Sequence, residues 1–129
     1  MEQRKIRRGQ IYMAALPEEV GSVQHGERPV LIIQNNKGNE YSPTVIVAPI
    51  TSKLGKRPLP THVRVINGGL PKDSIVLFEQ IRVLDKTQLG EYVGKLSQRQ
   101  MLKMGYAMSV SIGLEGIKHD RTENREGKR

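Results

Sequence analysis

Short apolar runs separated by glycine- and proline-containing turns are the feature that most constrains the fold of this chain. The run at 29–34 is continuous and rich in β-branched residues, which predicts a strand buried on both faces. The run at 62–66 alternates apolar and polar residues, as a half-exposed strand does. Further runs predict strands at 10–16, 44–50, 74–78, 81–84 and 92–96.

One strong helix signal follows the last of these runs. Ser97 and Gln100 have the spacing of a capping box, in which each side chain bonds the backbone N–H of the other residue. Apolar residues then recur at helical spacing and predict a face that packs against a sheet: Met101, Met104, Met108 and Ile112. A short helical turn is also expected from Asp85.

Several strands followed by one helix predict a mainly β protein with a C-terminal helix, an α+β fold built on a small SH3-like antiparallel barrel. The 129 residues fit one domain. We expect this domain to span residues 1–114. The remaining residues, 115–129, are polar and show no periodicity, which predicts a disordered tail.

The composition excludes several classes of protein. The chain has no cysteine, so it carries no disulfide framework, thiolate zinc site or cysteine nucleophile. No run approaches the roughly 20 apolar residues of a membrane span. The first residues are basic but lack the apolar stretch of a secretion signal. We therefore expect a cytoplasmic protein.

The net charge of +8 favours a polyanionic partner such as nucleic acid, although a soluble domain can also simply be basic. The excess lies inside the expected domain, because residues 37–72 carry Glu40 as their one acidic residue against six Lys and Arg. The chain has four tyrosines and one phenylalanine, too few to favour a platform on which several bases stack.

Familiar catalytic motifs are missing from the sequence. It contains no Walker loop, GxGxxG, HExxH or GxSxG. Its three histidines, His25, His62 and His119, do not have the spacing of metal ligands. We therefore expect neither a metal ion nor a cofactor.

Three groups of residues have the chemistry needed to bind a phosphodiester. Arg28 ends a polar loop just before a buried strand, where it is placed either to bind a phosphate or to cap the strand through a salt bridge. Thr51 follows a buried strand, where its hydroxyl either contacts a phosphoryl oxygen or forms a turn. Gln80 and Arg82 share one face of a strand, which is either an RNA-contacting or a merely solvated face.

With the basic loop residues Lys53, Lys56 and Arg57, these groups suit phosphodiester binding and metal-independent cleavage. RNA can be cut by its own 2′-OH if the protein helps remove that proton, stabilises the phosphorane and protonates the leaving oxygen. Arginine suits charge stabilisation but is a poor base, since its pKa exceeds about 12. His25 or His62 as the general base is a weaker hypothesis.

These residues lie in a series of motifs that resembles the MazF/PemK family of toxin endoribonucleases, and most closely its Gram-positive MazF branch. The motifs run in family order over about residues 6–114. They include Arg8-Gly-Gln-Ile-Tyr12, Gly21-Ser-x-Gln-x-Gly-x-Arg-Pro29, Val30-Leu-Ile-Ile-Gln-Asn35, Ile50-Thr51, Leu59-Pro-Thr-His-Val63 and Glu79-Gln-Ile-Arg82.

The resemblance implies a homodimer of small CcdB-like barrels, each with a C-terminal helix. It implies a type II toxin that cleaves single-stranded RNA, usually mRNA, at specific sequences without metal. It also implies a MazE-like antitoxin that covers the RNA-binding surface.

The family's catalytic arginine and threonine fall on Arg28 and Thr51. Its RNA-contacting positions fall on Ser22, Gln24, Gln80 and Arg82, and Thr61 and His62 also match. His25 lies in the same RNA-contacting loop, where relatives often have glycine, and Val23 stands where they often have glutamate. The recognised RNA sequence therefore cannot be carried over from relatives.

The residues alone leave two other functions open. One is a CcdB-like inhibitor of a protein target such as gyrase, and the other is an RNA-binding module without catalysis. The Arg28 and Thr51 pair favours the nuclease over both.

Overall fold

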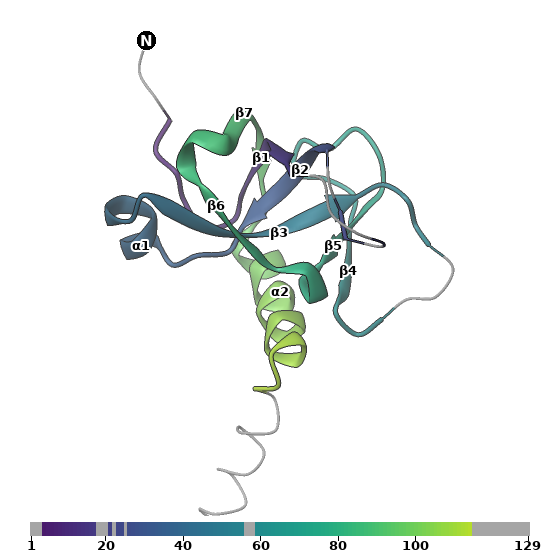
Figure 1. The fold of residues 1–129 in the computed structure, drawn as a ribbon. Coiled ribbons are helices and arrows are strands. Elements are labelled where there is room, and N and C mark those ends of the chain that lie inside the picture. The colour runs from purple at the N-terminus through teal and green to yellow at the C-terminus, as the bar shows by residue number, and fades with distance from the viewer. Residues whose placement is uncertain (1–3, 18–20, 22, 25, 56–58, 115–129) are drawn as a thin grey trace, which may run out of the picture.

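A central strand, β3 (Thr44–Thr51), organises a sheet of seven strands and one long helix in the residues that the computed structural model describes, 4–17, 21, 23–24, 26–55 and 59–114 (Figure 1). The other strands are β1 (Gln10–Leu16), β2 (Gly26–Ile32), β4 (His62–Val65), β5 (Ser74–Leu77), β6 (Arg82–Asp85) and β7 (Leu89–Lys95). The helices are α1 (Asn36–Tyr41) and α2 (Gln98–Ser111), with the 3₁₀ turns η1 (Phe78–Gln80) and η2 (Lys86–Gln88).

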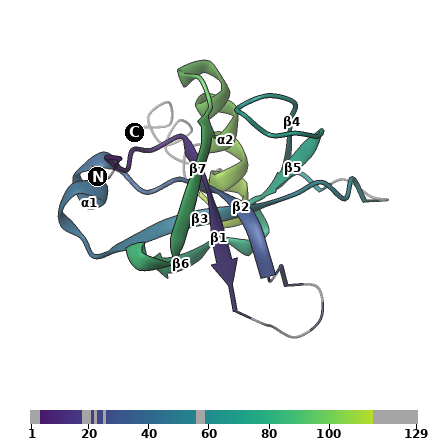
Figure 2. The ribbon, with the colours of Figure 1, turned by 90° about the horizontal axis from the view of Figure 1, so that it is seen from above.

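The strands are antiparallel and follow the order β4-β5-β3-β2-β1-β7, with β6 also paired to β3. One edge of β3 meets β2, while its other edge meets β6 near its start and β5 near its end. Figures 1 and 2 show α1 at one end of the sheet and the β4–β5 hairpin at the other. The predicted class is confirmed, but the described strands form an open sheet rather than a closed barrel.

The turn between β4 and β5 nevertheless touches β7, at the opposite end of the strand order. A Cβ at Gly69 would lie 2.1 Å from the carbonyl oxygen of Val93, and one at Gly94 would lie 2.1 Å from that of Gly68. Two backbones can approach this closely only where side chains are absent. This glycine contact joins the hairpin to the far strand without a ladder of hydrogen bonds.

Strand alternation sorts the core into two clusters, one on each face of the sheet. Leu31, Ala48 and Ile50 belong to the first cluster, which α2 covers with Met101 and Met104. The second cluster lies on the other face and comprises Tyr12, Ala14, Leu16, Val30, Ile32, Val45, Val47 and Leu84. Because β2 is buried on both faces, its run of apolar residues is continuous, as predicted.

The capping box of α2 forms as predicted, because Ser97 Oγ accepts from the Gln100 N–H and Gln100 Oε1 accepts from the Ser97 N–H. Met101 and Met104 are buried. Ile112 was expected on the same face but is 59 % exposed. The reason is that the helix ends at Ser111, and Gly113 then turns the backbone with φ of 80°.

Several elements differ from expectation. Gln80 was expected on one face of a strand with Arg82, but it lies in the 3₁₀ turn η1, and β6 begins only at Arg82. The strand β2 begins at Gly26, earlier than predicted, because its first residues pair with β1. The helix α1 stands where a turn was expected, and Asn35 caps it by accepting from the Gly38 N–H. The strand β7 begins at Leu89, directly after the helical turn expected from Asp85.

Two remaining expectations concern the ends of the fold. The predicted tail at 115–129 lies outside the described residues. Over the part of the chain that the structure describes, no helix is long and apolar enough to cross a membrane.

Replacing Met104 by alanine should lower the free energy of unfolding by about 2–5 kcal/mol, because the side chain is 1 % exposed between α2 and the sheet. Chemical denaturation of both proteins measures this loss. Leu102→Ala is the matched control on the same helix, since Leu102 is 77 % exposed. A comparable loss in both variants would contradict the packing described above.

Candidate functional site

Arg28 and Thr51 lie on neighbouring strands and face the same side of the sheet. Along β2, Val30 and Ile32 belong to the second core cluster, and Arg28 continues that alternation toward the start of the strand. Along β3, Val45 and Val47 belong to the same cluster, and Thr51 continues their alternation toward the end.

The paired part of the two strands runs toward these residues. It ends at Val30 and Pro49, each two positions short of Arg28 and Thr51, and the same register, if continued, would set Arg28 across from Thr51. Cα atoms directly opposite each other on antiparallel strands lie about 4.5–5.5 Å apart. In that continued register, the guanidinium and the hydroxyl would both reach one phosphate.

The Thr51 side chain is buried and already makes one hydrogen bond. Its Oγ1 accepts from the backbone N–H of Lys53 at 3.1 Å, which forms the turn anticipated for a hydroxyl after a strand. A hydroxyl that accepts still has its own proton to donate. The turn therefore orients the hydroxyl and is compatible with donation to a phosphoryl oxygen.

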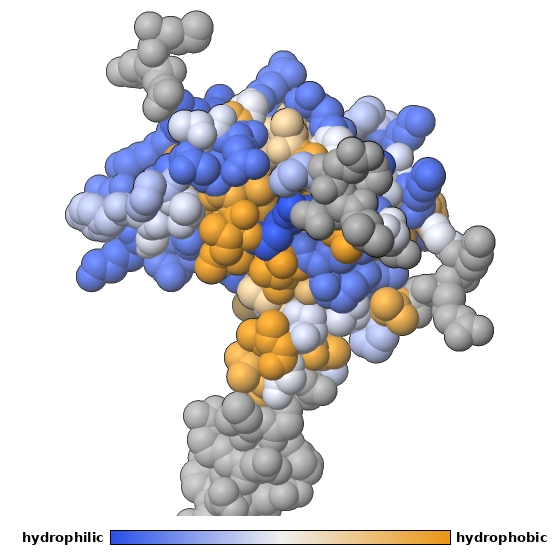
Figure 3. Space-filling view, in the orientation of Figure 1, coloured by the Kyte–Doolittle hydropathy of each residue, from blue (hydrophilic) through white to orange (hydrophobic). Residues whose placement is uncertain are grey.

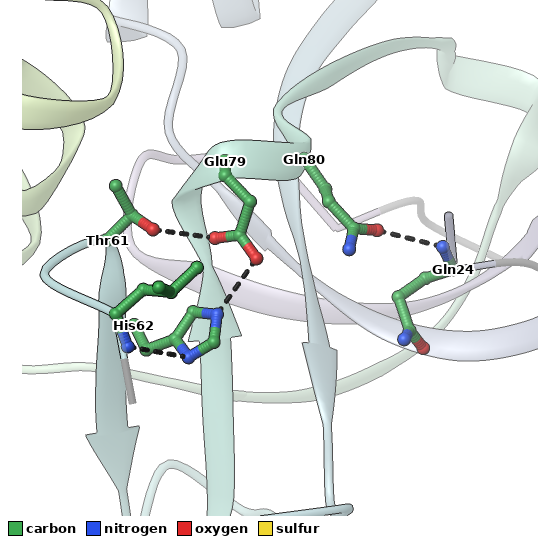
Figure 4. Close-up of polar contacts among 6 residues, drawn as sticks. Gln24, Thr61, His62, Glu79 and Gln80 are labelled. Atoms are coloured by element: carbon green, nitrogen blue, oxygen red, sulfur yellow. Dashed lines mark hydrogen bonds and ion pairs between the residues drawn. The ribbon is translucent and has the colours of Figure 1, made fainter. Parts of the chain in front are cut away.

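Gln80 and Arg82 hold the backbone of Gln24 from across the sheet. Gln80 Oε1 accepts from the Gln24 N–H at 2.8 Å, and the Arg82 guanidinium donates to the Gln24 carbonyl at 3.2 Å (Figure 4). Both backbone groups of Gln24 are thus bonded to side chains more than fifty positions away in sequence. We call these two bonds the Gln24 clamp.

The Gln24 clamp fixes where the backbone of Gln24 lies relative to β6. Arg82 pairs with Val47 of β3, so it emerges on the same side of the sheet as Arg28 and Thr51. Gln24 Oε1 is buried and has no hydrogen-bond partner among the described residues. A buried acceptor of this kind is costly unless a ligand or water satisfies it.

A second polar cluster joins Thr61, His62 and Glu79 at the β4 end of this face (Figure 4). The Glu79 carboxylate accepts from the Thr61 hydroxyl at 2.8 Å and from His62 Nε2 at 2.8 Å. His62 Nδ1 accepts from the Leu59 N–H at 3.4 Å. Both ring nitrogens of His62 are therefore engaged, which weakens the hypothesis that His62 is a general base.

The cluster sets the charge state of Glu79. Partial burial alone would raise the pKa of this carboxyl, but the hydrogen bonds from His62 and Thr61 outweigh that effect and hold its pKa below the ordinary value. Glu79 is therefore ionised at neutral pH and orients the imidazole beside it.

Other expected site residues are distributed as follows. Lys53 lies exposed just after Thr51. Ser22, His25, Lys56 and Arg57 lie outside the described residues. Within the described ranges, no group of three or more His, Asp and Glu side chains is arranged to hold a metal ion.

Sequence reasoning did not single out Glu79, Arg64 or Ile75 as site residues. Their relevance depends on which strands pair, since Ile75 is opposite Thr51 on one side and opposite Arg64 on the other. The one available signal was the motif 79–82, in which Glu79 precedes two residues that were singled out.

Comparison with known proteins supports one family. Residues 7–112 match the family described as the PemK-like, MazF-like toxin of type II toxin–antitoxin systems. The chain belongs to this family. Among curated proteins, this PemK/MazF toxin is 48 % identical over 119 residues to the endoribonuclease MazF of Staphylococcus epidermidis, covering 91 % of this chain and 99 % of that protein.

Solved structures agree with this assignment. A mycobacterial endoribonuclease in complex with its cognate antitoxin is 29 % identical, with a TM-score of 0.68 over 84 % of this chain and 96 % of that one. The Mycobacterium tuberculosis toxin MazF-mt6 is 28 % identical, with a TM-score of 0.70 over 81 % of this chain and 97 % of that one. The resemblance inferred from the motifs is thereby confirmed.

In this PemK/MazF toxin, Glu79→Gln should lower the free energy of unfolding above pH 4.5 but progressively less below it. A carboxyl whose pKa is depressed by folding stabilises the protein above its unfolded pKa, and that stability is lost as the pH falls through the folded pKa. Denaturation across the acid range measures the difference. Thr61→Val removes one of the two side-chain hydrogen bonds to Glu79, so it should reduce this pH-dependent stability in part. A difference between Glu79→Gln and the wild type that stays constant with pH would contradict the lowered pKa of Glu79.

Gln80→Ala should speed amide hydrogen exchange at Gln24 by about fivefold, since a hydrogen bond contributes about 1 kcal/mol. The measurement is residue-resolved exchange followed by NMR. Gln88→Ala is the matched control, because Gln88 Oε1 accepts from the Asp85 N–H elsewhere in the fold. Equal exchange at Gln24 in the wild type and in Gln80→Ala would show that the Gln24 clamp does not hold this backbone.

Proposed function

We propose that this toxin is a metal-independent endoribonuclease that cleaves single-stranded RNA, usually mRNA, at specific sequences. The observation that supports this most directly is that Arg28 and Thr51 lie on neighbouring antiparallel strands, at positions where side-chain alternation turns both toward the same side of the sheet. The relative from Staphylococcus epidermidis carries the name endoribonuclease, which agrees with this activity.

In the proposed reaction the 2′-oxygen of the RNA attacks the neighbouring phosphorus, and the bond from phosphorus to the 5′-oxygen breaks. The 2′-OH proton is lost and the leaving 5′-oxygen gains a proton, so the products carry a 2′,3′-cyclic phosphate and a 5′-OH. Arg28 donates hydrogen bonds to the phosphorane oxygens, where negative charge grows in the transition state. Thr51 donates to a phosphoryl oxygen and orients the phosphate.

The RNA strand lies, in this proposal, along the basic face beside these two residues. Lys53 and Arg82 attract its phosphates, and the buried Oε1 of Gln24 accepts a hydrogen bond from a base. Attraction of this kind weakens as salt rises, because counterions are released when the RNA binds.

We also propose a MazE-like antitoxin as the partner that blocks this face. The mycobacterial relative is known in complex with its cognate antitoxin. An acidic segment would compete with RNA phosphates for the same arginine and lysine side chains. The substrate, mRNA, implies that the toxin acts in the cytoplasm.

A homodimer is proposed on the evidence of an exposed apolar face. Ile46 of β3 and Val83 of β6 face each other across the ladder and are 37 % and 61 % exposed. Figure 3 shows apolar side chains gathered over β6 and the adjoining part of β3, and again over α2. Exposed apolar clusters of this kind mark surfaces that bind another protein.

Arg28→Ala should lower the rate of RNA cleavage by about 10²–10³ with EDTA present, the loss typical when one charge-stabilising donor is removed. Cleavage of a long single-stranded transcript by purified protein, followed on a gel, measures it. Arg99→Ala, which removes an exposed arginine of α2, is the control and should cut at the wild-type rate.

Thr51→Val should also slow cleavage, since it keeps the shape of the side chain but removes the hydroxyl proton. The proposal fails if the wild type leaves RNA intact or if Arg28→Ala cuts as fast as the wild type. Intact RNA together with binding to gyrase would favour the CcdB-like alternative, and RNA binding without cleavage would favour the non-catalytic module.

A further inference from the structure

A cavity separate from the face of Arg28 and Thr51 lies where the N-terminal segment meets the start of α2. Its volume is about 460 Å³, within the roughly 300–1,000 Å³ of pockets that hold small ligands. Its walls come from the turn ahead of β1, from the start of α1 and from the junction of β7 with α2. We call it the α2 cavity.

The α2 cavity and the candidate site lie at opposite ends of β2. The Gly9 N–H, in the turn ahead of β1, donates to the Ile32 carbonyl at 2.8 Å, so this turn adjoins the last residue of β2. Arg28 lies four residues earlier, about 13 Å away at the rise of an extended strand. Arg28 and Thr51 also face the side of the second core cluster, whereas α2 covers the first. The cavity is therefore not part of the proposed RNA-cleaving centre.

The charged residues that line the α2 cavity are all positive. They are Arg7, Arg8 and Lys95, and the described lining residues include no Asp or Glu. None of the three cations forms an ion pair with a carboxylate within the described ranges. Positive charges held together without a counter-charge favour an anionic ligand.

The turn that carries the two arginines is ordered before any ligand arrives. The Gln10 N–H donates to the Arg7 carbonyl at 3.1 Å, and Gly9 turns the backbone with φ of 96°. The Leu96 N–H donates to the Gly9 carbonyl at 2.9 Å, which joins the turn to the junction of β7 with α2. Groups that are ordered in advance lower the entropy cost of binding.

Arg8 is held through its backbone and through its side chain. Its N–H donates to Asn36 Oδ1 at 2.7 Å, and its Nε donates to the Ile33 carbonyl at 3.1 Å. A guanidinium carries several N–H groups in a planar fork, so one such bond orients it and leaves other donors for a phosphate.

Gln10 adds an amide donor to the same cavity. Its Oε1 accepts from the Arg7 N–H at 2.7 Å and from the Tyr12 hydroxyl at 2.9 Å. The residue is 9 % exposed, and no described residue accepts a hydrogen bond from its Nε2. Because Gln10 lines the cavity, this NH₂ group is placed to donate to an oxygen of the ligand.

The start of α2 adds a partial positive charge. Ser97 caps the helix by accepting from the Gln100 N–H, and Gln98, the first helical residue, lines the cavity. The first N–H groups of a helix have no partner within it and form the positive end of its dipole. Phosphate groups bind at such helix ends. The helix end therefore favours the same ligand as the cations and the Gln10 amide.

We propose that the α2 cavity binds the phosphate chain of a small polyphosphate, either inorganic tripolyphosphate or a nucleoside triphosphate. Such a chain presents several charged oxygens in a row, which matches cations, an amide donor and a helix end spread along one cavity. Leu96 and Met101 of the lining are 6 % and 7 % exposed, so they offer a base little surface. The inference does not rest on the proposed ribonuclease function, because no residue of the cavity takes part in it.

Calorimetric titration of the full chain with tripolyphosphate, ATP and AMP tests the site. Tripolyphosphate and ATP should bind, and AMP should bind about tenfold more weakly, because it offers fewer charged oxygens as hydrogen-bond acceptors. Equal Kd values for tripolyphosphate and ATP would identify the phosphate chain as the whole ligand, and a lower Kd for ATP would identify a nucleotide. A wild type that binds none of the three, or binds AMP as tightly as ATP, would overturn the proposal.

Two variants locate the binding. Gln10→Glu keeps an oxygen where Oε1 accepts its two bonds but replaces the amide donor by negative charge, so the Kd for tripolyphosphate should rise about tenfold. The double variant Arg8→Ala/Lys95→Ala removes two exposed cations and should also raise it, even if Gln10→Glu does not fold. Arg99→Ala, an exposed arginine of α2 outside the lining, is the matched control and should bind like the wild type. An unchanged Kd in both cavity variants would overturn the proposal.

A variant on the opposite face excludes binding elsewhere. Lys53→Ala removes a cation next to Thr51 and should leave the Kd for tripolyphosphate unchanged. If Lys53→Ala weakens binding and the cavity variants do not, the anion binds beside Thr51 and the proposal fails. Gln10→Glu should cut RNA at the wild-type rate. Joint loss of polyphosphate binding and RNA cleavage in a folded Gln10→Glu would show that the cavity is not a separate site.

Discussion

The pairing of β3 along both of its edges is the constraint on which the candidate site depends. Its hydrogen bonds to β2 reach Val30 and Pro49, two positions from Arg28 and Thr51, and its hydrogen bonds to β5 place Ile75 beside Thr51. Side chains alternate along a strand, so a slip of one residue on either edge would send one partner to the opposite face. Core packing prevents such a slip, because β3 buries apolar side chains on both faces. The same residues that stabilise the fold therefore decide which face of the sheet Arg28 and Thr51 occupy.

Side chains rather than strand pairing position Gln24, which precedes β2 and Arg28. Gln80 and Arg82 bond the two backbone groups of Gln24, much as a neighbouring strand would. Glu79, the adjacent residue, holds His62 and Thr61 by the same kind of contact. One short segment, 79–82, thus orders both ends of the face on which RNA is proposed to lie. This motif therefore contains residues that hold other site residues in place, as well as residues proposed to contact RNA.

Local sequence predicted most of the fold, because strand and helix signals depend on near neighbours. The continuous run before Ile33 and the capping box of Ser97 are examples in which a few adjacent residues decide the structure. The helix α1 was missed, since it depends on a side-chain cap from Asn35 and on bonds between Asn39 and Gln34 that no periodicity reveals. In the site, motif resemblance singled out Arg28 and Thr51 as catalytic candidates. The Gln24 clamp could not be foreseen, because its partners lie more than fifty positions apart in the sequence.

The glycine contact between the β4–β5 turn and β7 has a consequence for the basic face. Gly69 and Gly94 leave no room for even a methyl group, so backbone atoms of the turn and of β7 lie in direct contact there. The opposite end of that hairpin carries His62. A bulkier residue at either glycine would push the turn away from β7, and the His62 end of the hairpin would shift with it. The position of His62 beside Glu79 thus depends on a distant contact in which side chains are missing.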